Sequence, residues 1–257
     1  MVDTAALPRW DLSGLFPSLD SREFTASTEA LGADLARLTA LYDRHDVRAG
    51  APSDPTPADV AAFDEVVHAT NALLDQVRTL SAYVAALVST DAGNDQAATV
   101  QSRLQAELAG LQKLTTRFEA WVARFGAEAL VEATPVAADH AHALEQADRS
   151  AAHQMSEAEE SLFAELRLTG SSAWNKLHGD VTARLTGSLD GETLPITVIR
   201  GLATHGDGGI RQRAFVAELT AWESVAVTLA ACLNAIKGEA NTVNRRRGWA
   251  GSLEPAL

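Results

Sequence analysis

The chain has little cysteine, few aromatic residues and no excess of positive charge. Its one cysteine, Cys232, excludes an intrachain disulfide and suits a reducing compartment. Aromatic residues make up only 5%, whereas alanine and leucine are abundant, and such side chains favour helix because they lose little rotamer freedom there. The formal net charge is -13, so the surface repels phosphate, and we expect neither nucleic-acid nor anionic-membrane binding.

Long apolar runs and a secretory signal are also missing. The N-terminus has no basic region followed by an apolar core, as a signal peptide would. The most apolar stretch, residues 225–236, is shorter than the roughly 20 residues that span a bilayer. Since 46% of the residues are hydrophobic and 21% charged, the chain is able to bury a core. We therefore expect a cytoplasmic, water-soluble protein with no membrane partner.

Apolar residues recur at helical spacing along most of the chain, which predicts a mainly α fold. A first helix is expected over residues 21–44. Thr56 as cap, Pro57 at the first helical position and Asp59 in the first turn predict the start of a second helix. A third helix, residues 95–125, follows a short polar turn, so these two long helices should pack as an antiparallel pair. Gly126 and Pro135 bracket its end, and a shorter helix is expected over residues 137–149.

The spacing changes from helical to alternating near residues 182–196. Residues 182–189 and 192–196 flank Asp190-Gly191, a strong signal for a two-residue β-hairpin. We expect this small hairpin among long antiparallel, bundle-like helices.

Proline-rich and glycine-rich breaks suggest three segments. Residues 1–48 form an N-terminal arm and the first helix, and residues 57–125 form the long helix pair. Residues 136–257 hold shorter helices, the hairpin and a long final helix, over residues 207–248. Apolar residues along this final helix alternate between steps of four and three, which predicts a single apolar seam: Phe215, Leu219, Trp222, Ala226, Leu229, Leu233, Ile236 and Ala240.

No metal site is assigned. The His-Glu-x-x-His motif of zinc peptidases is absent. Glu65 and His68 have the spacing of helical di-iron sites, as do Asp139 and His142, but such a site needs further inward carboxylates. His68 lies on a polar stripe and is interpreted as a surface residue. His140 with His142 resembles a metal clip, although an exposed helix face is the favoured interpretation.

No catalytic or cofactor-binding residue is assigned either. Cys232 flanks the apolar seam and is interpreted as a buried, inert thiol. The segment Gly206-Asp207-Gly208-Gly209 lacks the lysine of a phosphate loop and is interpreted as a hinge or helix cap. Arg245-Arg246-Arg247 suits the negative end of the final helix, with Gly248 as its cap, and the alternative is an acidic partner or a substrate carboxylate.

Several short motifs, in order over nearly the whole chain, resemble the oligoendopeptidase F-type members of the M3 zinc metallopeptidases. They are Trp10-Asp11-Leu12 with Leu15-Phe16-Pro17, Tyr83 to Asp91 with Asn94, Ala173-Trp174-Asn175-Lys176-Leu177, Arg211 with Arg213-Ala214 and Trp222, and Leu233-Asn234-Ala235-Ile236-Lys237-Gly238 with Asn241 and Arg247-Gly248.

The resemblance implies a function that depends on residues absent here. In this family a His-Glu-x-x-His helix and a downstream glutamate bind zinc and activate water, and both lie beyond the matched region. The matching part is helical and walls off a deep channel that restricts substrates to short peptides. The resemblance thus implies the N-terminal, non-catalytic part of a zinc oligopeptidase, with no catalytic residue transferred to this chain.

Three hypotheses follow. The first is a substrate-restricting helical part of a zinc-dependent peptidase, inactive alone, with residues 136–257 starting the catalytic domain and short peptides as partners once the catalytic part is joined. The second is a standalone helical interaction module that associates through its final helix. The third is a di-metal helical oxidase, which requires His68 and His142 to point inward together.

Overall fold

Among the described residues, helices dominate and a single two-stranded antiparallel hairpin is present, so the predicted mainly α fold is confirmed. The structure is a computed structural model and describes residues 11–91, 93–251 and 253–256. Trp10 of the N-terminal motif and Ala92 of the polar turn lie outside the described residues. The chain divides into two compact units, Met1–Ser156 and Glu157–Leu257, here called the N-terminal and C-terminal units. The functional division into residues 1–48, 57–125 and 136–257 stays a prediction.

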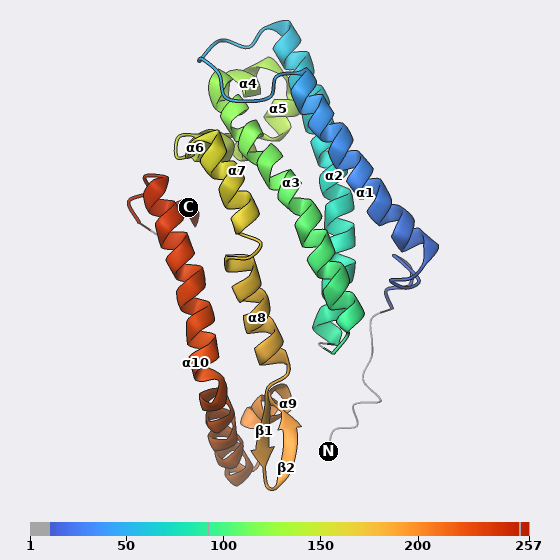
Figure 1. The fold of residues 1–257 in the computed structure, drawn as a ribbon, viewed down its shortest axis with the longest axis vertical. Helices are drawn as coiled ribbons and strands as arrows, with labels where there is room; N and C mark the ends of the chain where they lie inside the picture. The colour runs from blue at the N-terminus through green and yellow to red at the C-terminus, as the bar shows by residue number, and fades with distance from the viewer. Residues whose placement is uncertain (1–10, 92, 252, 257) are drawn as a thin grey trace. The chain divides into compact units, whose positions relative to one another are not determined.

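The N-terminal unit is built from three long helices and three short ones (Figure 1). In chain order they are α1 (Arg22–Arg44), α2 (Pro57–Thr90), α3 (Asp95–Phe125), α4 (Ala127–Ala133), α5 (Pro135–Asp139) and α6 (Ala141–Ala151). α1 packs on α2 and α3, and α6 packs on α3 and α4. α2 also packs on α3, so the predicted pairing of the two longest helices of this unit is observed.

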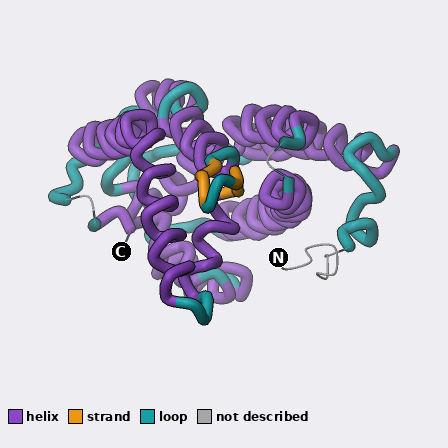
Figure 2. Tube along the Cα trace, turned by 90° about the horizontal axis from the view of Figure 1, so that it is seen from below, coloured by secondary structure: helices purple, strands orange, loops and turns teal. Residues whose placement is uncertain are grey.

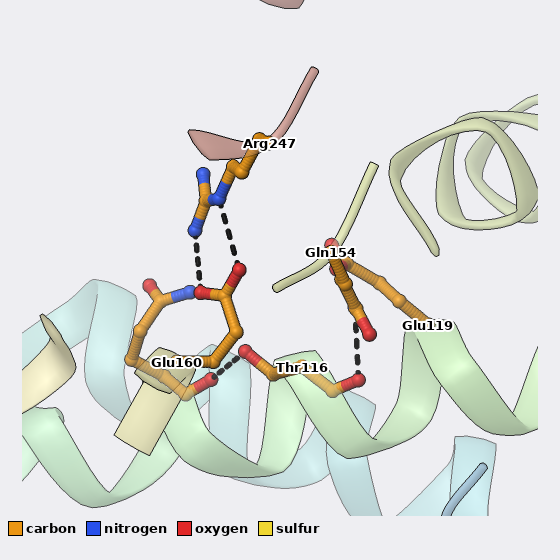
Figure 3. A network of polar contacts seen from close by, with 6 residues as sticks. Thr116, Glu119, Gln154, Glu160 and Arg247 are labelled. Carbon is orange, nitrogen blue, oxygen red and sulfur yellow. Dashed lines mark hydrogen bonds and ion pairs between the residues drawn. The ribbon is translucent and has the colours of Figure 1, made fainter. Parts of the chain in front are cut away.

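One continuous apolar core holds these helices together. Phe63 on α2 and Trp121 on α3 are both fully buried, with ring centroids 6.1 Å apart. Leu144 brings α6 into the same cluster. Beyond α6, the Gln154 amide donates to the carbonyl oxygen of Thr116 at 3.1 Å and to the Glu119 carboxylate at 2.7 Å, which fixes the end of the unit on α3 (Figure 3). The shared apolar core and the Gln154 hydrogen bonds thus both show that α1 to α6 pack as one unit.

The start of α2 follows the sequence signals closely. The Thr56 hydroxyl accepts from the Asp59 main-chain N–H at 3.3 Å, and the Asp59 carboxylate accepts from the Thr56 main-chain N–H at 2.9 Å. This reciprocal capping box satisfies two N–H groups that a helix start leaves without partners. The hydrogen bonds from Thr56 to the carboxylate lower the pKa of Asp59.

The sequence prediction misplaced the helices after α3. Residues 127–133, treated there as a break, form α4, and the single helix expected over residues 137–149 is two helices, α5 and α6. Gly126 adopts a positive φ of 81°, which ends α3 but lets α4 begin at the next residue. Pro135 stands at the first position of α5, where its missing N–H costs nothing.

The C-terminal unit combines helices with the hairpin. It contains α7 (Glu157–Leu166), α8 (Ser171–Ala183), β1 (Thr186–Leu189), β2 (Glu192–Pro195), α9 (Ile196–Gly201), the 3-10 turn η2 (Leu202–Thr204), α10 (Gly208–Arg246) and the 3-10 turn η3 (Glu254–Ala256). The strands, orange in Figure 2, join at Asp190-Gly191, whose φ angles of 52° and 88° are both positive, as the predicted two-residue turn requires. Residues 182–183, predicted as strand, instead end α8.

Small residues allow α10 to approach the hairpin closely. Ala214, Ala217 and Ala221 are the buried residues of α10 in this region, and they pack with Leu189, Leu185, Ile196 and Ile199 in two small clusters. A Cβ atom added at Gly187 would lie 2.7 Å from Ile199 Cδ1 and 3.4 Å from the Ala217 carbonyl oxygen. Any larger residue at this position of β1 would therefore displace the Ile199 side chain.

Candidate functional site

The histidines singled out from the sequence do not converge. His68 and His142 are exposed, so the inward orientation that a di-metal oxidase needs is not observed. His68 Nδ1 lies 2.6 Å from the Asp64 carbonyl oxygen of its own helix. His140 is half-buried, and both of its ring nitrogens have protein partners: Nδ1 lies 2.7 Å from the Val136 carbonyl oxygen and Nε2 lies 3.0 Å from the Asn71 amide nitrogen.

The donor groups present do not fit the zinc that the family resemblance implies. Within residues 11–91, 93–251 and 253–256, no three His, Cys, Asp or Glu side chains come together as a metal-binding group. Cys232 is fully buried on α10, as expected for a structural thiol. We therefore assign no step of a reaction to a metal held by these residues.

The glycine-rich segment before α10 forms a helix cap. The Asp207 carboxylate accepts from the Gly209 main-chain N–H at 2.7 Å. Arg211 donates to the carbonyl oxygens of His205 and Gly206 at 2.7 and 3.1 Å. These contacts explain the segment as the start of a long helix.

The arginines at the other end of α10 have acidic partners that the sequence did not reveal. Arg247 donates two hydrogen bonds to the Glu160 carboxylate, at 2.9 and 2.6 Å (Figure 3). Arg246 donates to Glu159 at 3.0 Å. Glu160 is buried on α7, so the basic cluster ties α7 to α10 within the C-terminal unit. Gly248 adopts the positive φ expected of a cap, 73°.

The apolar seam predicted on α10 is largely exposed at three of its residues. Phe215, Leu219 and Leu233 are 56%, 53% and 52% exposed. The buried residues of this helix lie elsewhere: Ala214, Ala217, Ala221, Cys232 and Val243. The spacing located the apolar residues on one side of the helix but left open whether that side is buried. The C-terminal unit therefore presents an exposed apolar face, defined here as Phe215, Leu219 and Leu233.

α10 also corrects the expectation about membrane-spanning length. It contains an 18-residue window of mean hydropathy 1.4, only 11% of which is buried. By length and composition alone, this helix is able to cross a membrane. The same exposure fits a helix whose apolar face packs against further polypeptide.

A groove of about 550 Å³ runs beside the hairpin, and nothing in the sequence pattern indicated it. Its walls are β1 and one side of α10: Thr186, Gly187, Ser188, Leu189, Asp190, Gln212, Arg213, Val216, Ala217, Thr220, Ala221 and Ser224. At one end Arg213 donates two hydrogen bonds to Asp190, at 2.9 and 3.2 Å. The hydrogen bonds to Asp190, with its negative charge, raise the pKa of the Arg213 guanidinium, which stays charged.

Comparison with known proteins supports the family resemblance. Residues 127–186 match the family profile of the M3 peptidase N-terminal domain, described as Oligopeptidase F. No curated protein sequence matches the chain. The fold is similar to the crystal structure of oligoendopeptidase-F from Enterococcus faecium, with a TM-score of 0.73 and 17% identity. That match covers 92% of this chain and 46% of the Enterococcus chain, so this chain spans less than half the length of the protein it resembles.

The profile match spans α4 to α8 and the first residue of β1, and the fold match covers 92% of the chain. Residues 127–186 thus match the M3 peptidase N-terminal family, and the fold of the chain is similar to that of oligoendopeptidase-F.

Proposed function

We propose that this chain is the substrate-restricting helical part of a zinc-dependent oligopeptidase that hydrolyses short peptides. The observation that supports this role most is the fold match, which covers 92% of this chain but only 46% of the oligoendopeptidase-F chain. The zinc ligands and the general base would come from polypeptide outside these 257 residues. In this proposal the present chain supplies helical walls and no catalytic side chain.

The proposed partners and location follow the same reasoning. Short peptides are the substrates when the catalytic part is joined, and the net charge of -13 disfavours nucleic acid. The single cysteine fits the reducing cytoplasm. The exposed apolar face of α10 is the surface we assign to packing against the catalytic part, because apolar patches of this kind mark interaction sites.

The coding DNA beyond the codon for Leu257, together with neighbouring genes, provides the test. We expect a frame that encodes His-Glu-x-x-His, and its product, produced together with this chain, should hydrolyse short fluorogenic peptides in a zinc-dependent way. The matched control replaces the glutamate of that motif by glutamine and should abolish hydrolysis. Hydrolysis that is equally fast without this chain, or equally fast on folded proteins and on short peptides, would contradict the enclosing role.

A second candidate function is a standalone interaction module that docks a partner through α10. The exposed apolar face on that helix favours it. The two candidates differ in the partner: the first requires a polypeptide that carries zinc ligands, and the second does not. Purification of the native complex, followed by zinc analysis of the captured partner, distinguishes them.

A further inference from the structure

One edge of β1 has backbone groups that the hairpin does not use. Thr186 faces Pro195 across the hairpin, and this pair lies beside a hydrogen-bonded one, so it is of the non-hydrogen-bonded kind. The next pair outward is hydrogen-bonded, with the Ile196 N–H donating to the Leu185 carbonyl oxygen at 2.9 Å. Antiparallel pairs alternate between the two kinds, so Ser188, opposite Thr193, is also in a non-hydrogen-bonded pair.

The backbone N–H and C=O groups of Thr186 and Ser188 therefore point away from β2. Both residues are exposed. Within the described part of the chain, β1 and β2 form a two-stranded sheet, and no further strand lies on this edge. An edge with unpaired donors and acceptors is a template on which another extended chain can pair.

The groove beside the hairpin lies along this same edge. Its lining includes every residue of β1 and none of β2. Its far wall is a ridge of α10 residues spaced four apart, Gln212, Val216, Thr220 and Ser224. The ridge from residue 212 to residue 224 is about 18 Å long, which matches about five residues of extended peptide at ~3.3 Å each.

The residues that line the groove are better suited to bind the main chain of a peptide than a charged side chain of the peptide. Its two charged residues, Arg213 and Asp190, neutralise each other at one end. Val216, 53% exposed, offers an apolar contact, and Thr186, Ser188 and Thr220 are small and polar. A neighbouring strand lies about 4.8 Å from the edge it joins.

We propose that the outer edge of β1, with the α10 ridge as its second wall, binds an extended peptide of about five residues as a third strand. Main-chain hydrogen bonds to Thr186 and Ser188 give the affinity, as in other cases of strand addition. This site is a property of the present chain alone and is measured by binding without hydrolysis. If the chain does not bind the peptide, the proposed peptidase function is unaffected. If the proposed function proves wrong, the peptide site can still be tested.

The test uses the whole chain and a fluorescein-labelled pentapeptide of alternating threonine and valine, followed by fluorescence anisotropy. The twin peptide carries N-methyl groups on alternate amides, which removes the donors on one edge. We expect the parent peptide to bind and the methylated twin to bind about tenfold more weakly, since about 1.4 kcal/mol of hydrogen bonding is lost. Equal affinity for the two peptides, or no binding of the parent at millimolar concentration, would overturn the proposal.

Matched proline variants locate the site. Ser188→Pro removes an outward N–H of β1 without removing a hydrogen bond between the strands, and proline is tolerated at such an edge. Thr193→Pro makes the same change on the outer edge of β2. We expect about a tenfold loss for Ser188→Pro and unchanged affinity for Thr193→Pro. Equal effects of the two variants would contradict the assignment to β1.

Two measurements keep the test decisive if Ser188→Pro fails to fold. Val216→Glu changes an exposed side chain on the ridge and should weaken binding at least fivefold while the melting temperature stays the same; unchanged binding counts against the groove. Sedimentation velocity of the wild type addresses the competing occupant. A dimer that Ser188→Pro converts to monomer would assign the edge to a second copy of the chain and overturn the peptide proposal.

Discussion

Arg247 and Glu160, 87 positions apart in the sequence, are joined by two parallel hydrogen bonds of 2.9 and 2.6 Å. The Glu160 side chain is only 4% exposed, whereas the neighbouring pair, Arg246 and Glu159, is 62% and 47% exposed. Both ion pairs join α7 to the C-terminal end of α10, so they form a natural comparison between buried and exposed charge.

We expect Arg247→Ala to destabilise the C-terminal unit by about 2–3 kcal/mol, because the buried Glu160 carboxylate loses its bidentate partner. The partial exposure of Arg247 keeps the cost below that of a fully buried pair. Arg246→Ala is the matched control and should cost less than about 1 kcal/mol, as exposed ion pairs do. The urea midpoint of the unit measures both. Equal midpoints for the two variants would contradict the assigned role of the buried pair.

The capping box of α2 gives a pH-dependent prediction. Because the pKa of Asp59 is lowered from 3.8 in the folded chain, its contribution to stability is present above that value and is lost as the pH falls through the lower folded pKa. Thr56→Ala removes the hydroxyl contact and should destabilise by about 1 kcal/mol at pH 7. The variant should also show a shallower loss of stability between about pH 4 and pH 2 than the wild type.

Thr79→Ala provides the control on the same helix. The Thr79 hydroxyl donates to the Asp75 carbonyl oxygen within α2 and caps no helix end. Its removal should change the unfolding free energy by less than about 0.5 kcal/mol and leave the acid dependence unchanged. A Thr56→Ala variant with the stability and acid profile of Thr79→Ala would count against the capping box.

The close approach of α10 to β1 predicts a compensating pair of substitutions. Gly187→Ala places a methyl group against Ile199 Cδ1 and should destabilise by about 1–3 kcal/mol. Ile199→Val removes that methyl group and should cost about 1 kcal/mol alone. The double variant should be more stable than the sum of the single effects predicts, by thermal unfolding. Strict additivity would show that the two side chains are not in conflict.

The sequence predicted the helix start and the hairpin turn well, but it did not determine which side of α10 is buried. Thr56, Pro57 and Asp59 mark the start of α2 as they were expected to, and Asp190-Gly191 forms the expected turn. These features depend on neighbours in the chain, so the sequence specifies them directly. The side of α10 that is buried depends instead on how closely Ala217 can approach Gly187, a contact between distant positions.

The exposed apolar face of α10 predicts the solution behaviour of the isolated chain. Phe215 and Leu219 lie four residues apart and are both more than half exposed. We expect the wild type to bind a hydrophobic dye and to self-associate at high concentration, because large exposed apolar patches favour both. The double variant Phe215→Ser with Leu219→Ser should reduce both signals at least threefold without lowering the melting temperature.

Val227→Ser is the control for this experiment. Val227 is 86% exposed but is displaced around the helix from Phe215 and Leu219. Its substitution should leave dye binding nearly unchanged. If the control reduces the signal as much as the double variant, general hydrophobicity explains the effect and the face has no special role. Binding of the wild type to neutral lipid vesicles would instead assign the helix to a membrane.

The claim that this chain is the non-catalytic part of a zinc oligopeptidase is tested most directly by assaying the purified chain alone. Zinc content by mass spectrometry and cleavage of a quenched fluorogenic oligopeptide are measured on the same sample. The account predicts zinc far below one equivalent per chain and no cleavage above the rate of the buffer. One equivalent of tightly bound zinc, or chelator-sensitive cleavage of the peptide, would contradict it.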